Sequence, residues 1–472
     1  MSNPYKKLGA NMFLFAISSF GTKLIGFLLI PMYTNWLTTE EYGIADMLNT
    51  AVQLVVPIFS VDIADAVIRF LLEKKQERIS VLYIALRVIL IGSVILFLLI
   101  LGLKQFGIIF IPNKYYGFIF ISFALTSMYN IFVNFFKGNE HVRNIVFAGL
   151  ICSLVNASCN ILFLTKFNMG VDGYLMANLL SIAISLAYFL FCSFNYGYIK
   201  LNYIQNNRYA EKEMLIYSAP LVLNGLGWWV NNSLDRMFVT LMLGIGANGL
   251  LAVAYKIPSI LSMLQTIFNQ AWALSSIQEF DSEDKNGFVG NIYSYYGCLI
   301  TVASSMILFL NIPLATILYS NDFFYAWKYT GMLIIAHLFG GLSVCISGVF
   351  NAVKDTKTLA MTTVFGALAN VLFNATLIPY LGIHGAVMST MLSNMIVWAW
   401  RMYNVRKFIR LKINIKRDIA SYALVIFQCL VGISEDHMYI IQFIICIIII
   451  VIYKTELEII FRKIIELIGK KV

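Results

Sequence analysis

Long apolar segments alternate with short polar connections along the whole chain. Most segments are close to the ~20 residues that an α-helix needs to cross a bilayer. They do not alternate apolar and polar residues in single steps, as the strands of a membrane β-barrel do. The pattern therefore predicts an all-α polytopic membrane protein with about fourteen transmembrane helices. The predicted spans are 11–33, 43–68, 82–103, 117–136, 144–165, 173–194, 214–240, 249–277, 290–311, 329–350, 359–378, 384–404, 419–433 and 438–453.

Composition supports this class of protein. Hydrophobic residues make up 60% of the 472 positions and charged residues only 12%, and the mean hydropathy is +0.79. Soluble domains are roughly 45–50% apolar and about 25% charged. Soluble enzymes, nucleic-acid-binding proteins and disordered chains are therefore excluded, and the net charge of +10 does not predict a nucleic-acid partner.

The distribution of basic residues predicts the topology. The connections on the side of the N-terminus hold 26 Lys and Arg, seven of them between Arg401 and Arg417, whereas the opposite connections hold four. Cytoplasmic loops carry this excess, so both termini are predicted to be cytoplasmic and the number of spans even. The tail 455–472 places apolar and charged residues on different helical faces, which predicts a helix lying on the inner leaflet.

An internal repeat relates the two halves of the chain. Leu37–Gly43 pairs with Leu243–Gly249 at an offset of 206 residues. Asn156 and Asn160 pair with Asn370 and Asn374 at an offset of 214. Gly170–Gly173 pairs with Gly382–Gly385 at an offset of 212. Six spans separate the members of each pair, so the halves have the same orientation, as in parallel transporter repeats. We predict a six-helix bundle over 1–200, a second over 201–412, two extra helices over 413–454 and the amphipathic tail.

Three motifs carry a resemblance to a known family. The first motif is Gly21–Gly26, followed by Pro31, Tyr33 and Leu37–Gly43. The second is Asp235-Arg236, followed by Leu243 and Ala254–Pro258. The third is Asn370–Ala386. In order and spacing they resemble bacterial polysaccharide-biosynthesis membrane proteins, the O-antigen flippases of the multidrug/oligosaccharidyl-lipid/polysaccharide exporter superfamily.

The resemblance implies a V-shaped, two-bundle transporter with a central cavity in the bacterial inner (plasma) membrane. Its substrate would be an undecaprenyl-pyrophosphate-linked oligosaccharide, moved from the cytoplasmic to the periplasmic leaflet by alternating access. Membrane lipids, a polysaccharide polymerase and chain-length proteins are the partners that this reading implies.

Four basic residues fall within or at the ends of predicted spans: Lys23, Arg87, Arg236 and Lys256. A charge at the bilayer centre costs from ~2.5 to more than 10 kcal/mol and usually faces a cavity or a partner. These cations are candidates to bind the anionic diphosphate of the substrate. Arg87 can instead extend to the interface, and Arg236 can pair with the neighbouring Asp235.

Three carboxylates in the second span are candidates for coupling transport to H⁺ or Na⁺: Asp62, Asp65 and Asp46. A buried carboxylate with a raised pKa can exchange a proton as a cavity opens to alternate sides. The alternative for Asp62 and Asp65 is a structural cluster with Arg69 on one helical face. The alternative for Asp46 is a position at the membrane–water interface with no role in coupling.

Two prolines are candidate hinges, Pro57 and Pro258, although each can equally make a static kink. The seven cysteines lie in apolar runs and the four histidines lack ligand spacing, so no metal or other cofactor is predicted.

Alternative functions remain open. They are a lipid II-type flippase, a drug/cation antiporter of the same superfamily, and a membrane glycosyltransferase or polymerase. The enzyme would require a large periplasmic loop, whereas the connections on that side are short. We therefore expect a transporter and not an enzyme.

Overall fold

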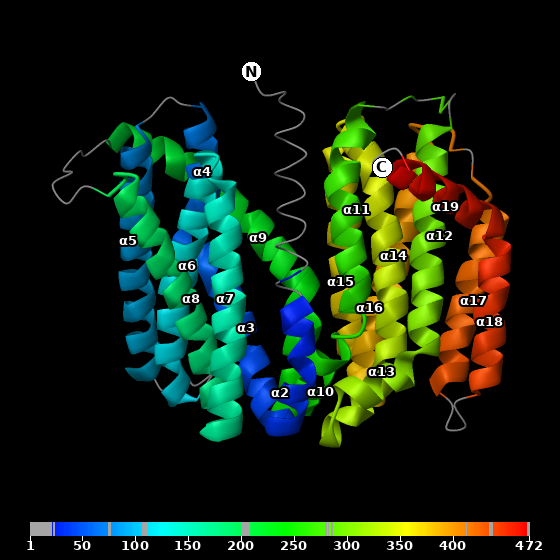
Figure 1. Cartoon of the computed structure of the whole chain (residues 1–472), viewed down its shortest axis with the longest axis horizontal. Coiled ribbons are helices and arrows are strands. Elements are labelled where there is room, and N and C mark those ends of the chain that lie inside the picture. The colour runs from blue at the N-terminus through cyan, green and yellow to red at the C-terminus, as the bar shows by residue number, and fades with distance from the viewer. Residues whose placement is uncertain are drawn as a thin grey trace. The chain divides into compact units, whose positions relative to one another are not determined.

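The structure is a computed structural model. It describes residues 21, 24–73, 77–105, 112–199, 208–278, 281, 283–284, 287–411, 413–433 and 438–469. Within these ranges the regular elements are helices (Figure 1). The predicted all-helical class is therefore confirmed for the part of the chain that is described.

The helices follow one another through short connections. Their bounds are α2 Ile30–Trp36, α3 Thr39–Ser60, α4 Ile63–Glu73, α5 Arg78–Gln105, α6 Tyr116–Gly138, α7 Val142–Ile161, α8 Gly170–Asn195, α9 Arg208–Leu243, α10 Ile245–Ala254, α11 Ser259–Gln278, α12 Phe288–Phe309, α13 Asn311–Leu318, α14 Trp327–Ala352, α15 Thr356–Leu381, α16 Ile383–Val405, α17 Ile415–Ile433, α18 Tyr439–Ile452 and α19 Lys454–Gly469. Three short elements complete the set: η1 Asn113–Tyr115, the π-helical turn η2 Leu162–Lys166 and η3 Asn321–Ala326.

Among the described residues, eight helices are long and apolar enough to cross a membrane. The number rises to ten if the bent pairs α10–α11 and α18–α19 each form one span. The polytopic character is confirmed, whereas the count of fourteen is not. Much of the first predicted span, 11–33, lies outside the described residues, and the second is broken within its length.

The chain packs as two compact units, Met1–Leu234 and Asp235–Val472. The division falls inside α9, later than the domain boundary predicted at 200/201. The first part of α9 packs within the first unit: Tyr217 meets Phe70 ring to ring, and the Trp229 indole donates to the Thr50 carbonyl at 2.9 Å. Apolar and hydrogen-bonding contacts of α9 therefore place the division later than the polar stretch near residue 200.

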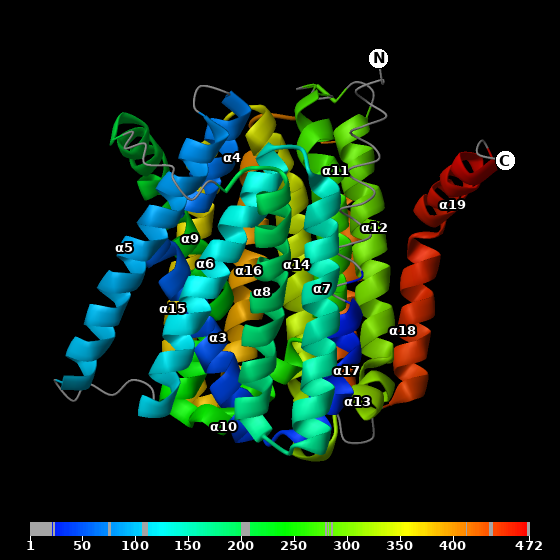
Figure 2. The same ribbon diagram turned by 60° about the vertical axis from the view of Figure 1, so that its left-hand side comes forward.

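In the first unit, α4 and α6 pack together, and α7 and α8 form an antiparallel pair (Figure 2). Phe132, Phe136 and Phe189 are fully buried between these helices. At the start of α3, Thr38 accepts from the Glu41 N–H while Glu41 accepts from the Thr38 N–H. This reciprocal capping is worth ~1 kcal/mol and gives the Leu37–Gly43 motif a structural role.

Between Leu90 and Leu101 of α5, every exposed side chain is apolar. Leu90, Val94 and Leu98 are each more than half exposed. In water such a surface would be unstable, whereas acyl chains solvate it without loss. The exposure therefore agrees with a helix that faces lipid.

The internal repeat appears as matched local structure in the two units. The α6–α7 connection has Glu140 at φ 62°, and the α14–α15 connection has Lys354 at φ 60°. Each is followed by a residue whose N–H donates five residues back, His141 to Phe136 and Asp355 to Phe350. These pairs keep the offset of 214 that the asparagine motif predicts.

The asparagine motif itself forms the same bond twice. The Asn160 amide donates to Asn156 Oδ1 at 3.1 Å, and the Asn374 amide donates to Asn370 Oδ1 at 2.9 Å. The repeat predicted from the sequence motifs is thus also a repeat of side-chain hydrogen bonds.

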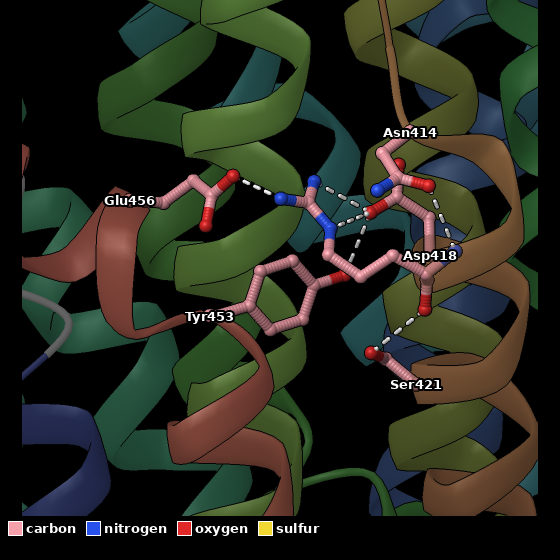
Figure 3. A network of polar contacts seen from close by, with 6 residues as sticks. Asn414, Asp418, Ser421, Tyr453 and Glu456 are labelled. Carbon is pink, nitrogen blue, oxygen red and sulfur yellow. Dashed lines mark hydrogen bonds and ion pairs between the residues drawn. The ribbon is translucent and has the colours of Figure 1, made fainter.

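In the second unit, α14 packs against α11, α12 and α16, and α17 and α18 pack against α12. A polar network ties the tail helix α19 to the start of α17 (Figure 3). Arg417 bonds Asp418 at 2.8 Å and also pairs with Glu456, and the Tyr453 hydroxyl donates to Asp418 at 3.2 Å. These bonds hold the 65° bend between α18 and α19. The tail is helical over Lys454–Gly469, as predicted, and its position on the inner leaflet stays a prediction.

Candidate functional site

A buried carboxylate lies on α9 at the start of the second unit. Asp235 is only 4% exposed. Tyr255, just after α10, donates its hydroxyl to Asp235 Oδ2, and the Thr390 hydroxyl of α16 donates to the same oxygen at 3.5 Å. The other oxygen accepts the Arg236 N–H at 2.9 Å. Three elements far apart in sequence therefore converge on one carboxylate.

One predicted cation contacts this cluster, and a second directly follows one of its members in the sequence. The Arg236 guanidinium lies 5.1 Å from the centre of the Tyr255 ring, a cation–π distance. Lys256 follows Tyr255 directly, in the turn that separates α10 from α11. Pro258 is in the same turn, where the two helices bend by 54°. The structure thus places Arg236 at the Asp235 cluster, and Lys256 and Pro258 lie in the turn that directly follows Tyr255.

A second layer of polar groups supports Tyr255. The ring of His337 on α14 meets the Tyr255 ring edge-on at 6.3 Å. His337 Nδ1 lies 2.8 Å from the Leu333 carbonyl, and its own carbonyl accepts from Gln265 at 2.7 Å. These contacts fix the aromatic ring whose hydroxyl holds the carboxylate.

This arrangement can take up a cation or a proton. Carboxylate and hydroxyl oxygens are ligands for Na⁺-sized hard cations, and a buried carboxylate is also a proton acceptor. The sequence predicts Asp235 as part of a family-like motif and as a local partner of Arg236, and not as the centre of this cluster. Its partners Tyr255 and Thr390 lie 20 and 155 residues away, and no local spacing connects them.

The predicted second span contains a break. α3 ends at Ser60 and α4 begins at Ile63, with Val61 at φ 52° and Asp62 at φ 46°. A left-handed conformation is rare for a β-branched residue and costs about 1–3 kcal/mol. The expectation that Asp62, Asp65 and Arg69 share one continuous helical face is therefore wrong, because Asp62 lies outside α4.

Close packing surrounds this break. A Cβ added at Gly225 of α9 would lie 3.1 Å from Asp62 Oδ2 and 3.2 Å from Pro57. A Cβ added at Gly92 of α5 would collide with the Phe59 carbonyl at 1.9 Å. Glycines on two neighbouring helices thus admit the broken backbone. Pro57 lies inside α3 before the break, and its role as a hinge stays a prediction.

The other acidic candidates lie in more open surroundings. Asp65 on α4 is exposed and accepts a long bond of 3.5 Å from Asn134. Arg69 pairs with Glu73 at 3.0 Å and lies over the Tyr217 ring at 4.4 Å. Asp46 is half-buried on α3. Coupling roles for Asp46, Asp62 and Asp65 stay predictions.

The remaining cation candidates differ in position. Arg87 on α5 forms an ion pair with Glu211 in the first turn of α9 at 3.2 Å, and its side chain is 44% exposed. It thus has an acidic partner within its own unit. Lys23 lies outside the described residues.

One buried cation belongs to a helix and not to the connection predicted to hold it. Arg401 was counted among the residues of a cytoplasmic connection, but it lies within α16 and is only 8% exposed. Its guanidinium donates to Thr362 at 3.1 Å, to Thr363 at 2.9 Å and to the Ser343 hydroxyl at 3.0 Å. The hydroxyls of α14 and α15 allow this charge inside the helical bundle.

Comparisons with known proteins place the chain in a family. The family model "Polysaccharide biosynthesis protein" matches residues 8–273, more than half of the chain. The chain belongs to this polysaccharide biosynthesis family. No curated protein sequence matches it significantly.

Solved structures share the fold. Lipid II flippase MurJ in an inward closed conformation superposes with a TM-score of 0.67 at 14% identity, over 96% of this chain and all of that one. An inward-facing multidrug resistance MATE transporter gives 0.62 at 14% identity, over 82% of this chain and 95% of that one. The Vibrio cholerae MATE transporter VcmN D35N mutant gives 0.52 at 15% identity, over 85% and 96%. The fold is therefore that of MurJ and MATE transporters, as the sequence predicted.

Proposed function

We propose that this protein is a flippase that moves an undecaprenyl-pyrophosphate-linked oligosaccharide from the cytoplasmic to the outer leaflet of a bacterial plasma membrane. The observation that carries the proposal is the combination of a polysaccharide biosynthesis family match with the MurJ/MATE transporter fold. A member of such a family with such a fold moves a building block of the polysaccharide.

Intramembrane cations give the proposal a chemical basis. The diphosphate of the substrate is anionic and binds Arg and Lys through charge-assisted hydrogen bonds. Arg236 and Lys256 are the cations that we assign to this contact in the second unit, with Lys23 as the corresponding candidate near the N-terminus. Arg87 contributes less because Glu211 already neutralises part of its charge.

We further propose that transport is coupled to H⁺ or Na⁺ through Asp235. Its burial and its hydroxyl partners favour it over Asp46, Asp62 and Asp65, because Asp65 is exposed and Asp62 lies in a backbone break. Binding a cation at Asp235 would compete with the Tyr255 hydroxyl for the same oxygen. Loss of that bond would free the turn between α10 and α11, where Lys256 and Pro258 lie.

The proposal is tested by transfer of a fluorescent undecaprenyl-pyrophosphate oligosaccharide in proteoliposomes, with and without a pH or Na⁺ gradient. Liposomes carrying the purified protein should transfer the lipid-linked glycan, and protein-free liposomes should not. Absence of transfer for every member of a glycan panel would refute the function.

The same liposomes separate the alternatives. Lipid II is the second candidate substrate because the MurJ structure superposes over nearly the whole chain. Transfer of lipid II alone would make the protein a lipid II-type flippase. Gradient-driven export of an organic cation, without lipid transfer, would make it a drug/cation antiporter.

A further inference from the structure

A cavity of about 370 Å³ lies within the first unit. Its walls come from residues 25–29 and from α3, α6, α7 and α8. Its volume falls in the range of small-molecule pockets, about 300–1,000 Å³. It is separate from the Asp235 cluster, which belongs to the other unit.

The polar lining of the cavity is uncharged. Among the described residues that line it, none is Asp, Glu, Lys, Arg or His. The polar groups are amides and hydroxyls, and they come from four helices. They include Asn49, Ser122, Thr126, Ser153, Asn156 and Asn178. A cation or a diphosphate needs an opposing charge, whereas this lining suits a neutral ligand with many hydroxyl groups.

Hydrogen bonds fix the orientation of one side of the cavity. The Asn156 amide donates to Asn178 Oδ1 at 2.7 Å, and Asn156 Oδ1 accepts from Asn160. The oxygens of Asn156 and Asn178 are thereby engaged, and the Asn178 amide N–H groups remain to serve a ligand. Amides held in this way are ordered before a ligand arrives, which lowers the entropic cost of binding.

The walls that α3 and α6 contribute hold polar groups that have no partner within the described parts of the chain. No hydrogen bond joins the Asn49 amide, the Ser122 hydroxyl or the Thr126 hydroxyl to another described residue. Ser122 is 5% exposed. Buried polar groups are nearly always hydrogen-bonded to protein, water or a ligand. A hydroxylated ligand would satisfy these groups and the Asn178 amide at once.

Apolar groups complete the wall. Phe118 and Tyr174 line the cavity together with Leu29 and Val52. The Tyr174 ring is held edge-on against Tyr33 at 5.1 Å. A pyranose ring has an apolar face of C–H groups and a rim of hydroxyls, so it matches a site with rings and amides together. A hydrocarbon chain would leave the amides and hydroxyls without partners.

We propose that this cavity binds one neutral sugar residue of the translocated glycan. The proposal rests on the flippase function proposed above and adds to it a contact for the sugar, distinct from the cations that contact the diphosphate. It makes selection of the glycan a property of the first unit.

Binding is measured by saturation-transfer difference NMR on the full chain in lipid nanodiscs, free of sugar-containing detergent. The probes are the methyl glycosides of glucose, galactose, mannose and N-acetylglucosamine, with methyl glucuronide and glycerol as charged and small comparators. We expect saturation of at least one neutral glycoside and none of the comparators. No saturation of any neutral glycoside would overturn the proposal.

Two variants assign the signal to the cavity. Gly26 lines it, and a Cβ added there meets no atom within 4 Å, so Gly26→Leu should fill the space and reduce the signal at least fivefold. Gly102→Leu on α5 is the matched control, because Gly102 also has open space and does not line the cavity. A signal unchanged by Gly26→Leu would overturn the proposal.

A double substitution keeps the proposal testable if Gly26→Leu fails to fold. Ser122→Ala with Thr126→Val removes two hydroxyls with little change in volume and should also reduce the signal at least fivefold. Equal signals from this double variant and the unmodified protein would contradict the proposed contacts.

The outcome is independent of transport. Lipid transfer by a protein that binds no glycoside would leave the flippase function standing and overturn the sugar site. Glycoside binding that Gly26→Leu abolishes, in a protein that transfers no lipid-linked glycan, would support the site and refute the flippase.

Discussion

The two halves of this chain use corresponding positions for different chemistry. The offset of 206 pairs Asp235 with Leu29 and Tyr255 with Asn49, and the offset of 212 pairs Thr390 with Asn178. In the second half these positions form a closed cluster around a carboxylate. In the first half they line an uncharged cavity. The repeated scaffold thus carries an ionisable site in one half and a neutral one in the other.

The offset is supported by structure on both sides. The Thr34 hydroxyl donates to the Ile30 carbonyl at 3.2 Å, and the corresponding Thr240 hydroxyl donates to the Arg236 carbonyl at 2.8 Å. The two asparagine pairs form the same bond. The exchange of Asp235 for Leu29 is therefore a change of side chain at an equivalent place.

Helix breaks also differ between the halves. The first half breaks at Val61 and Asp62, and the corresponding part of α11 is continuous. The second half breaks after Ala254, and the corresponding part of α3 is continuous. The helix break of each half therefore lies at a charged residue, Asp62 in the first half and Lys256 in the second.

The largest expected effect on transport separates the cations of the two halves. Arg236→Gln and Lys256→Gln should each slow lipid-linked glycan transfer at least tenfold, equivalent to ~1.4 kcal/mol in the barrier. Arg87→Gln should slow it less than threefold, because Glu211 already pairs with Arg87. Transfer rates are measured in proteoliposomes at matched protein content. Equal slowing by all three changes would remove the distinction between the halves.

A second prediction compares Arg401 with Phe189, its counterpart at the offset of 212. Phe189→Ala should lower the free energy of unfolding by about 3–5 kcal/mol, because it empties a fully buried site. Arg401→Ala should cost about 2–4 kcal/mol through the lost volume and hydrogen bonds.

Arg401→Met is the control for the charge. It should cost less than ~1.5 kcal/mol, because Met fills the volume and the buried charge is removed. Thr362 and Thr363 keep their bonds to main-chain carbonyls. Unfolding is followed by thermal denaturation in detergent. A loss from Arg401→Met as large as that from Arg401→Ala would show that the charge itself is required.

A smaller effect is expected at the break in the first half. Val61→Gly should stabilise the protein by up to ~1 kcal/mol, because glycine adopts the left-handed conformation without strain. Ile267→Gly, at the corresponding helical position in α11, should destabilise it by ~1 kcal/mol. The two melting temperatures should therefore move in opposite directions. A parallel shift would indicate that Val61 bears no strain.

The smallest effect concerns pH at two equivalent connections. Burial, together with the charge of Arg78, lowers the pKa of His141 below its usual 6.5. Hydrogen bonds from the Thr358 hydroxyl and N–H lower the pKa of Asp355 below its usual 3.8. A group whose pKa is lower in the folded protein than in the unfolded chain stabilises the fold at pH values above its ordinary pKa. This stabilisation is lost as the pH falls through the pKa of the group in the folded protein. The α6–α7 connection should therefore loosen below about pH 6.5 and the α14–α15 connection only below about pH 4.

Hydrogen exchange of the two connections at pH 7.5, 5.5 and 3.5, corrected for intrinsic rates, measures the order in which they loosen as the pH falls. His141→Gln should remove the response near pH 6 from the first connection only. Loosening of the α14–α15 connection at pH 5.5 would contradict the assignment.

The hydropathy pattern was sufficient to predict the helical class and the paired motifs to predict the repeat, because spans and motifs are local features of the chain. The Asp235 cluster was missed because its members come from α9, the turn after α10 and α16, and neither Tyr255 nor Thr390 carries a charge that marks it. The cavity was missed for the same reason. It is built from asparagines, serines and threonines that look unremarkable in any one span.

Two local errors have physical causes. Val61 and Asp62 carry no glycine or proline signal, so the sequence showed a continuous helix where packing against Gly92 and Gly225 stabilises a break. Arg401 lies close to the basic residues of the next connection and was grouped with them. The hydroxyls that bury it lie on α14 and α15, and their approach depends on the fold.

The central claim, that the second half couples transport to an ion through Asp235, is tested most directly by comparing Asp235→Asn with Asp62→Asn. Lipid-linked glycan transfer is measured in proteoliposomes before and after an H⁺ or Na⁺ gradient is imposed, with melting temperatures as a check on folding. Asp235→Asn should fold normally and lose the acceleration that the gradient gives, whereas Asp62→Asn should keep it. A full gradient response in Asp235→Asn, or its loss in Asp62→Asn alone, would contradict the account.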